Sequence, residues 1–133
     1  MTGWVNSCRD HGGVIFIDLR DREGLTQCVF RPEESAESAR LSHALRVEDV
    51  IQVTGKVESR PEIEGKSTVN SELPTGEIEI AATELIIVNK AEVLPFQLDK
   101  ELSNEDLRLG HRFLDLRRPR MTGNLRTRHR VTK

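Results

Sequence analysis

Four side chains in the first 80 residues have the chemistry needed to hold unpaired nucleobases. Phe16 offers an aromatic face on which a base can stack, and Gln27 carries an amide that can donate to and accept from a base edge. Arg9 can form two hydrogen bonds with guanine or pair with a phosphate, and Glu79 can accept from a cytosine amine. If one surface carries all four, it suits a few splayed bases of a single-stranded RNA loop.

The same residues have ordinary structural interpretations, which the sequence leaves open. Phe16 can pack beneath the long 59–76 segment, because small apolar clusters under long loops are common. Gln27 can be a solvated amide, Arg9 can form a weak surface ion pair with its acidic neighbour, and Glu79 can belong to a solvated strand face. No nucleophile motif and no phosphate-binding glycine loop of Walker or Rossmann type is present, so no catalytic set emerges.

Charge is unevenly distributed along the 133 residues. Residues 1–100 carry 11 Lys and Arg against 18 Asp and Glu, a net charge of −7, whereas residues 101–133 carry 9 against 4, a net charge of +5. Non-specific binding of nucleic acid depends on neutralising phosphates. The acidic main region therefore argues against indiscriminate binding and favours a local site.

Composition also limits location and metal binding. No run of about 18 apolar residues is present, and the N-terminal segment lacks the apolar centre of a signal peptide, so we expect a cytoplasmic protein without membrane contact. Two cysteines are too few for a disulfide framework. The potential metal ligands lack CxxC or HxxxH spacing, so we expect no metal site. They are Cys8, His11, Cys28, His43, His111 and His129.

Short segments of strand character fill the first 90 residues. The expected strands are 3–9, 14–20, 25–30, 49–59 and 76–89. Alternation along the second of these sends Ile15 and Ile17 to one face and Phe16 to the other. Pro32, followed by two acidic residues, is expected to open a helix that runs to about Leu45.

Five strands with a helix between the third and fourth are the order of an OB-fold barrel, which binds oligonucleotides across its second and third strands. We therefore predict an all-β fold with one main helix, a five-stranded OB-fold barrel over residues 1–92. A partly helical hinge over 93–120 follows, in which Ser103 is the expected N-cap. The eighteen-residue 59–76 segment is expected to be a functional or disordered loop.

The chain resembles the anticodon-binding domain of bacterial-type aspartyl-tRNA synthetase, a class II enzyme. The matching stretches include GWVNSCRDHGGVIFIDLRDREGLTQCVF, LPTGEIEI, VLPF and RFLDLRRPRM, in family order over nearly the whole chain. The resemblance implies that Arg9 lies at the first anticodon base, a guanine or its modified form. It also implies that Phe16 stacks on the anticodon and that Gln27 contacts the middle uracil.

The third anticodon base is a cytosine in this family, and the resemblance places three further residues near it or its phosphates. They are Arg60, Asn70 and Glu79. Where the family often has arginines, this chain has Ser7 and Cys8, which weakens the expected phosphate contact beside Arg9.

The resemblance also implies a larger enzyme. Residues 121–133 resemble the start of the catalytic domain, and the three class II motifs lie beyond them. We expect a truncated chain that lacks aminoacylation activity and binds no cofactor itself, whereas ATP and Mg²⁺ serve the full-length enzyme. Expected partners are tRNA and the missing catalytic domain, within a full-length homodimer. Because the family has a longer lead-in before Gly3, we expect a frayed barrel edge.

The hinge carries four arginines with two equally supported roles, contact with the tRNA backbone or pairing with the absent domain. They are Arg112, Arg117, Arg118 and Arg120. Two other functions stay open: a free-standing OB-fold protein that binds single strands without sequence preference, and an inert fragment with no RNA role. Whether the parent enzyme charges aspartate tRNA alone or also asparagine tRNA stays open too, since the two anticodons differ at the third base.

Overall fold

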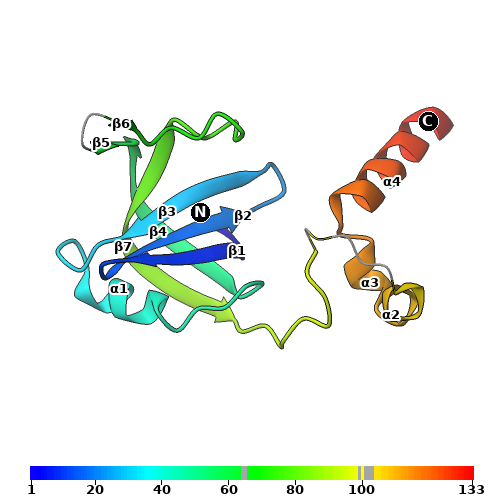
Figure 1. Cartoon of the computed structure of the whole chain (residues 1–133), viewed down its shortest axis with the longest axis horizontal. Coiled ribbons are helices and arrows are strands. Elements are labelled where there is room, and N and C mark those ends of the chain that lie inside the picture. Colours follow the sequence, from blue (N-terminus) through cyan, green and yellow to red (C-terminus); the bar gives the residue numbers. More distant parts are fainter. Residues whose placement is uncertain (64–65, 99, 101–103) are drawn as a thin grey trace. The chain divides into compact units, whose positions relative to one another are not determined.

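The computed structural model describes residues 1–63, 66–98, 100 and 104–133 (Figure 1). The chain divides into two compact units, Met1–Ala91 and Glu92–Lys133. The first unit contains a closed barrel with the strand order β1-β2-β3-β7-β4. The predicted five-stranded barrel is therefore confirmed.

The barrel strands are β1 (Thr2–His11), β2 (Val14–Arg20), β3 (Leu25–Phe30), β4 (Val50–Ser59) and β7 (Ile78–Asn89). Between β4 and β7 the chain forms a short hairpin of β5 (Glu62–Ile63) and β6 (Lys66–Ser67), which lies within the segment 59–76 that was expected to be a functional or disordered loop. Neighbouring barrel strands run antiparallel except β3 and β7, which run parallel.

The register of β2 and β3 fixes which side chains share a face. Ile17 lies opposite Cys28, and Asp18 lies opposite Gln27. Opposed residues in an antiparallel pair point to the same side, so alternate pairs face the interior and the outside of the barrel. The predicted outward position of Phe16 follows from this register, because both of its sequence neighbours are buried in the core.

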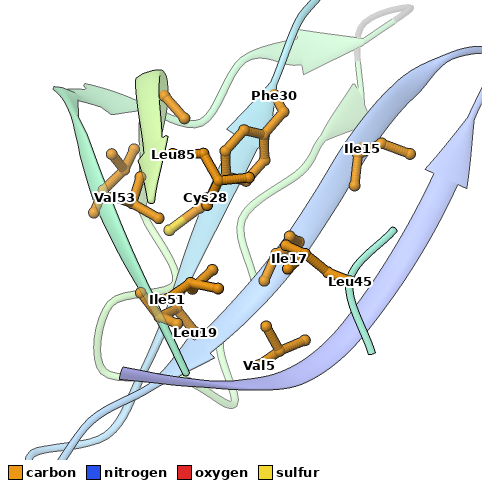
Figure 2. Close-up of a cluster of buried hydrophobic side chains, with 12 residues drawn as sticks. Val5, Ile15, Ile17, Leu19, Cys28, Phe30, Leu45, Ile51, Val53 and Leu85 are labelled. Carbon is orange, nitrogen blue, oxygen red and sulfur yellow. The ribbon is translucent and has the colours of Figure 1, made fainter. Parts of the chain in front are cut away.

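The interior of the barrel is filled almost entirely by aliphatic side chains (Figure 2). The buried cluster consists of Val5, Ile15, Ile17, Leu19, Cys28, Phe30, Leu45, Ile51, Val53, Ile80, Ala82 and Leu85. These residues come from all five barrel strands and from the segment after α1. Removal of this apolar surface from water is the main term that stabilises the barrel.

Helix α1 (Ala36–Ser42) is shorter than the sequence indicated. The predicted start at Pro32 was wrong, because residues 32–34 form a turn and Ser35 is the N-cap. Its hydroxyl accepts from the backbone N–H of Ser38 at 3.3 Å, which satisfies one of the free donors of the first turn. The helix ends before Leu45, whose side chain joins the core.

The expected fraying of the first strand was wrong. β1 pairs with β4 from Thr2, which lies opposite Gln52. The amino group of Met1 donates to the Val53 carbonyl at 2.7 Å, and the Val53 N–H donates to the Met1 carbonyl at 2.8 Å. These bonds continue the ladder to the first residue and close the barrel at this edge.

The second unit contains the helices α2 (Glu105–Gly110), α3 (Arg112–Asp115) and α4 (Pro119–Thr132). The residue predicted as the N-cap, Ser103, lies outside the described residues, and the cap of α2 is Asn104 instead. Its side-chain oxygen accepts from the Leu107 N–H at 3.0 Å, and Asn and Ser cap helices about equally well.

Candidate nucleic-acid interface

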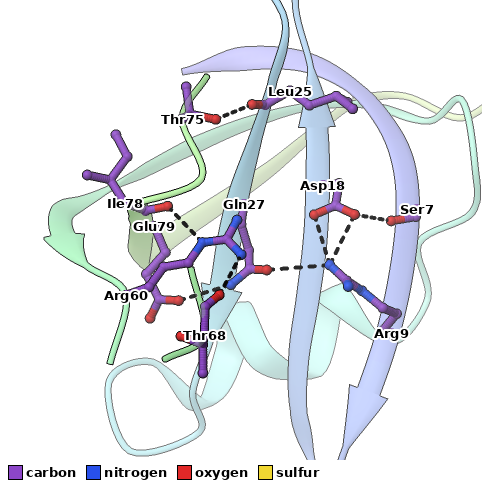
Figure 3. Close-up of polar contacts among 10 residues, drawn as sticks. All are labelled: Ser7, Arg9, Asp18, Leu25, Gln27, Arg60, Thr68, Thr75, Ile78 and Glu79. Carbon is purple, nitrogen blue, oxygen red and sulfur yellow. Dashed lines mark hydrogen bonds and ion pairs between the residues drawn. The ribbon is translucent and has the colours of Figure 1, made fainter. Parts of the chain in front are cut away.

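A chain of hydrogen-bonded side chains crosses the outer face of β1, β2, β3 and β7 (Figure 3). Asp18 on β2 accepts from Arg9 of β1, which also donates to Gln27 of β3. Gln27 in turn donates to Glu79 of β7. We call these four residues the polar row. It brings three of the four base-binding candidates together on one surface.

Arg9 is held in place but accessible. Its Nη2 lies 2.9 Å from Oδ1 and 3.0 Å from Oδ2 of Asp18, and Ser7 donates to the same carboxylate at 2.5 Å. In place of the alternative pair with its neighbour Asp10, Arg9 pairs with Asp18, and the Asp10 carboxylate accepts from the Gly13 N–H. With 48% of the Arg9 side chain exposed, its guanidinium can still contact a guanine or a phosphate.

Gln27 and Glu79 are buried although they lie on the outer face, with 7% and 2% of their surface exposed. The Gln27 Nε2 donates to Glu79 Oε2 at 3.0 Å, and Gln27 Oε1 lies 3.4 Å from Arg9 Nη2. These two contacts assign the amide orientation of Gln27. The solvated interpretations of both residues are therefore wrong.

Arg31 completes this arrangement, although no sequence pattern singled it out. It directly follows β3, and its Nη2 lies 2.7 Å from Glu79 Oε1 while its Nη1 lies 3.2 Å from Glu34 Oε1. Burial on its own would lower the pKa of Arg31, but the hydrogen bonds and charges of Glu79 and then Glu34 raise the pKa overall. Arg31 therefore stays charged between two carboxylates.

Phe16 is half-buried on the outer face, between Arg9 and Val29 in the strand register. Its ring meets the imidazole of His11 edge to face, with ring centroids 5.7 Å apart and planes at 72°. Such a contact holds an aromatic ring in one orientation while leaving part of its surface open. From the sequence, His11 stood out only as a potential metal ligand. Its contact with Phe16 makes it a further residue of this face.

Arg60 and Asn70 both lie in the segment between β4 and β7. Arg60 donates from Nε to the Ile78 carbonyl at 3.2 Å and from Nη1 to the Thr68 carbonyl at 3.3 Å (Figure 3). Ile78 directly precedes Glu79 in the sequence. Its buried Nη2 has no hydrogen-bond partner among the residues that the structure describes. It is a donor to which an RNA oxygen could bind.

Asn70 has a local structural role. Its side-chain oxygen accepts from the Glu72 N–H at 3.0 Å, and its backbone N–H donates to the Gly76 carbonyl at 3.0 Å. A Cβ at Gly76 would lie 1.7 Å from the Asn70 carbonyl oxygen, so only glycine fits there. The Thr75 hydroxyl donates to the Leu25 carbonyl and attaches this loop to β3.

The four hinge arginines divide into two kinds. Arg112 and Arg118 both pair with the fully buried Asp115, at 2.6 Å and 3.5 Å. Arg117 and Arg120 lie on exposed positions. A further arginine, Arg108, also pairs with Asp115 at 3.0 Å, and its hydrogen bond, followed by the positive charges around it, lowers the pKa of that carboxyl against the effect of burial.

The described residues include no cluster of three or more His, Cys, Asp or Glu side chains that could hold a metal ion. In the same part of the chain, no helix combines the length and apolar character needed to cross a membrane. Of the two free thiols, Cys8 is exposed and Cys28 is buried in the core. Burial raises the pKa of Cys28 to about 12, so this thiol is chemically inert.

A family model of tRNA anticodon type, described as the OB-fold nucleic acid binding domain, matches residues 1–88. The chain belongs to this family. It is 55% identical over 131 residues to the aspartate–tRNA(Asp/Asn) ligase of Magnetococcus marinus, a match that covers 98% of this chain and 21% of the relative. It is 48% identical to the aspartate–tRNA ligase of Enterococcus faecalis, covering 100% of this chain and 22% of that protein.

The chain therefore spans little more than a fifth of the curated relatives it matches. Solved structures agree in fold: the aspartyl-tRNA synthetase of Entamoeba histolytica has a TM-score of 0.77 at 21% identity, covering 95% of this chain and 30% of that one. The asparaginyl-tRNA synthetase of Pyrococcus horikoshii has a TM-score of 0.72 at 24% identity, covering 90% and 25%. The OB-fold and the resemblance to aspartate–tRNA ligases, both predicted from the sequence, are confirmed.

Proposed function

We propose that the outer face of β2, β3 and β7 binds the anticodon loop of an aspartate-type tRNA. The observation that carries this proposal is the polar row itself, which joins an exposed arginine to a buried amide and a buried carboxylate, beside a half-buried phenylalanine ring. A stacking surface next to hydrogen-bonding groups is the arrangement by which proteins hold unpaired bases. The family membership of residues 1–88 supports the same ligand class.

Each group in this face suits one feature of a guanine–uracil–cytosine anticodon. Phe16 stacks on a base, and the exposed guanidinium of Arg9 donates to guanine O6 and N7. The amide of Gln27 can accept from uracil N3–H while it donates to a uracil oxygen. Glu79 uses each carboxylate oxygen once within the protein, at Arg31 and at Gln27, and retains lone pairs for the cytosine amine.

Arg60 and Asn70 contribute differently to the third position. The unpartnered Nη2 of Arg60 suits a phosphate or base oxygen near Glu79. Asn70 shapes the loop through its contacts with Glu72 and Gly76, and its amide nitrogen is the group left to meet RNA.

The longer protein to which such a domain belongs is proposed to be a cytoplasmic, homodimeric aspartate–tRNA ligase. ATP and Mg²⁺ would supply the energy and the charge stabilisation for its amino-acid activation. We assign the binding of both to the rest of that protein. The role of this chain in that protein is to select the tRNA by its anticodon.

The hinge arginines have two proposed roles, contact with the tRNA backbone or pairing with the remaining domain. Arg112 and Arg118 are already paired with Asp115, which fits a structural role. The exposed Arg117 and Arg120 suit either the tRNA backbone or a carboxylate of the remaining domain.

The test is a fluorescence titration of the 133-residue chain with three RNAs: an anticodon stem-loop of aspartate type, the same stem-loop with a swapped anticodon, and poly-U. We expect the aspartate-type loop to bind most tightly at moderate salt. Equal affinity for all three would instead identify a generic single-strand binder, and no binding at all would contradict any RNA role. The salt concentration must be fixed, because phosphate contacts make every affinity salt-dependent.

A further inference from the structure

We infer that Arg31 is a positioning residue that determines how strongly the third anticodon base is discriminated, by holding the Glu79 carboxylate in one orientation. This inference rests on the proposed function, since it concerns which RNA loop the face prefers. Arg31 lies outside the strands that form the face and entered none of the sequence-based assignments.

The Glu79 carboxylate is held at both of its oxygens. Arg31 Nη2 lies 2.7 Å from Oε1, and Gln27 Nε2 lies 3.0 Å from Oε2. A carboxylate bound from two sides cannot rotate without losing one of the bonds, and the bond to the charged arginine is the stronger. Loss of Arg31 would leave Glu79 attached only through the neutral amide of Gln27.

Arg31 is itself held firmly. Its backbone carbonyl accepts from the N–H groups of Glu34 and Ser35, both at 3.1 Å, in the turn that leads into α1. Its side chain bridges Glu79 and Glu34, and only 22% of it is exposed. A guanidinium fixed at both ends transmits a fixed geometry to the carboxylate it binds.

The orientation of Glu79 matters because cytosine and uracil differ at position 4, which carries an amine in cytosine and an oxygen in uracil, and at N3, which accepts in cytosine and donates in uracil. A carboxylate only accepts hydrogen bonds, so it binds the N4 amine of cytosine and repels the O4 oxygen of uracil. Discrimination by an accepting group depends on presenting its lone pairs at the right place, and a group that can turn aside accepts uracil with less repulsion. A loose Glu79 should therefore discriminate less.

The experiment compares wild-type protein with Arg31→Met, which keeps the length of the side chain and removes its charge. Both are titrated with two anticodon stem-loops that differ only by cytosine or uracil at the third base. We expect the cytosine-to-uracil affinity ratio to fall at least about fivefold in Arg31→Met, because the cytosine loop binds more weakly and the uracil loop is repelled less. Arg31→Lys should restore part of the ratio, because it returns a charged donor without the fork geometry.

Glu34→Gln is the matched control, because it removes the charge of the other carboxylate bound to Arg31 and leaves the contact with Glu79. The amide oxygen of the glutamine can still accept from Arg31, so the affinity ratio should stay close to that of the wild type. Thermal melting of each variant separates loss of orientation from loss of fold: a lower melting temperature with an unchanged ratio would make Arg31 merely structural and overturn the inference.

Two further outcomes would overturn it. Equal weakening of both loops by Arg31→Met, with a shallower salt dependence, would identify a phosphate contact instead. A wild-type protein that prefers these loops over poly-U but does not distinguish cytosine from uracil would refute the inference and leave the proposed function intact. A wild-type protein that binds neither loop would contradict both.

Discussion

The inner and outer faces of the β2–β3 pair are both buried in places, but for different reasons. Ile17 and Cys28 lie opposite each other inside the barrel and are surrounded by aliphatic side chains. One residue along each strand, Asp18 and Gln27 lie opposite each other outside it, in the polar row. Gln27 is nearly as inaccessible as its inner neighbours, with 7% of its surface exposed.

This difference separates packing from recognition on a single pair of strands. Inner residues have only non-directional apolar contacts, whose value lies in the surface removed from water. Outer residues have directional hydrogen bonds, which a base can replace one for one. Substitutions on the inner face should therefore change stability, and substitutions on the outer face should change RNA binding.

The largest expected effect is on the inner face. Ile17→Ala should lower the free energy of unfolding by about 2–5 kcal/mol, because Ile17 is fully buried and its truncation leaves a cavity in the core. Urea denaturation followed by circular dichroism measures this, and Ile17→Val should cost only about 0.5–1.5 kcal/mol. If the fraction that remains folded also bound RNA more weakly, the inner face would contribute to recognition as well as to stability, which would contradict this comparison.

Phe16→Ala tests the neighbouring outer position. It should weaken binding of the aspartate-type stem-loop by about 1–3 kcal/mol, the value of one base stacked on an aromatic ring. Its melting temperature should change little, and Phe16→Leu, which keeps apolar bulk without an aromatic face, should lose binding in the same way. A drop of several degrees in melting temperature would mean that the ring packs rather than stacks.

Arg9→Ala sharpens the comparison at the accessible end of the polar row. The loss of affinity should be about tenfold larger for a loop with guanine at the first anticodon position than for one with adenine, because only guanine offers both O6 and N7 as acceptors. The stability should fall by less than about 1 kcal/mol, since the pair with Asp18 is largely exposed at Arg9. Equal loss for both loops would reduce Arg9 to a phosphate contact.

The smallest expected effect is a pH dependence from the inner face. The pKa of Cys28 is raised from 9.0 to about 12 in the folded state, so the unfolded chain releases this proton first. The stabilising contribution is complete below pH 9 and is lost as pH rises towards 12, by about 1 kcal/mol between pH 9 and 10. Unfolding measured across this range should show a much smaller slope in Cys28→Val than in the wild type. A part remains because burial, and then the charge of Asp10, also raise the pKa of Cys8. Cys8→Ser is the matched control and should keep most of the slope.

The sequence could predict the barrel and its outward-facing residues because both follow from period-two alternation. The register of Phe16, Asp18 and Gln27 depends only on two adjacent strands joined by a tight turn. Local patterns of this kind are complete within a few residues of the chain.

Contacts between distant parts of the chain could not be predicted in the same way. Gln27 and Glu79 are 52 residues apart, and Arg31 and Glu79 are 48 apart. Their pairing depends on β7 crossing to lie beside β3, which the local sequence does not reveal. Taken alone, each of these polar residues is therefore typical of a solvated surface position. The prediction of the helix start was wrong for a different reason, because Ser35 caps the helix more effectively than Pro32 opens it.

The parallel junction of β3 and β7 gives the polar row a second importance. Within the described strands, only Cys28 with Ile80 and Val29 with Ala81 are paired there, whereas β4 and β7 are paired at ten positions. The bonds from Gln27 and Arg31 to Glu79 cross this same short junction. Substitutions that change the RNA preference of this face will therefore also affect the closure of the barrel. A redesign for another RNA should first lengthen the backbone ladder between β3 and β7.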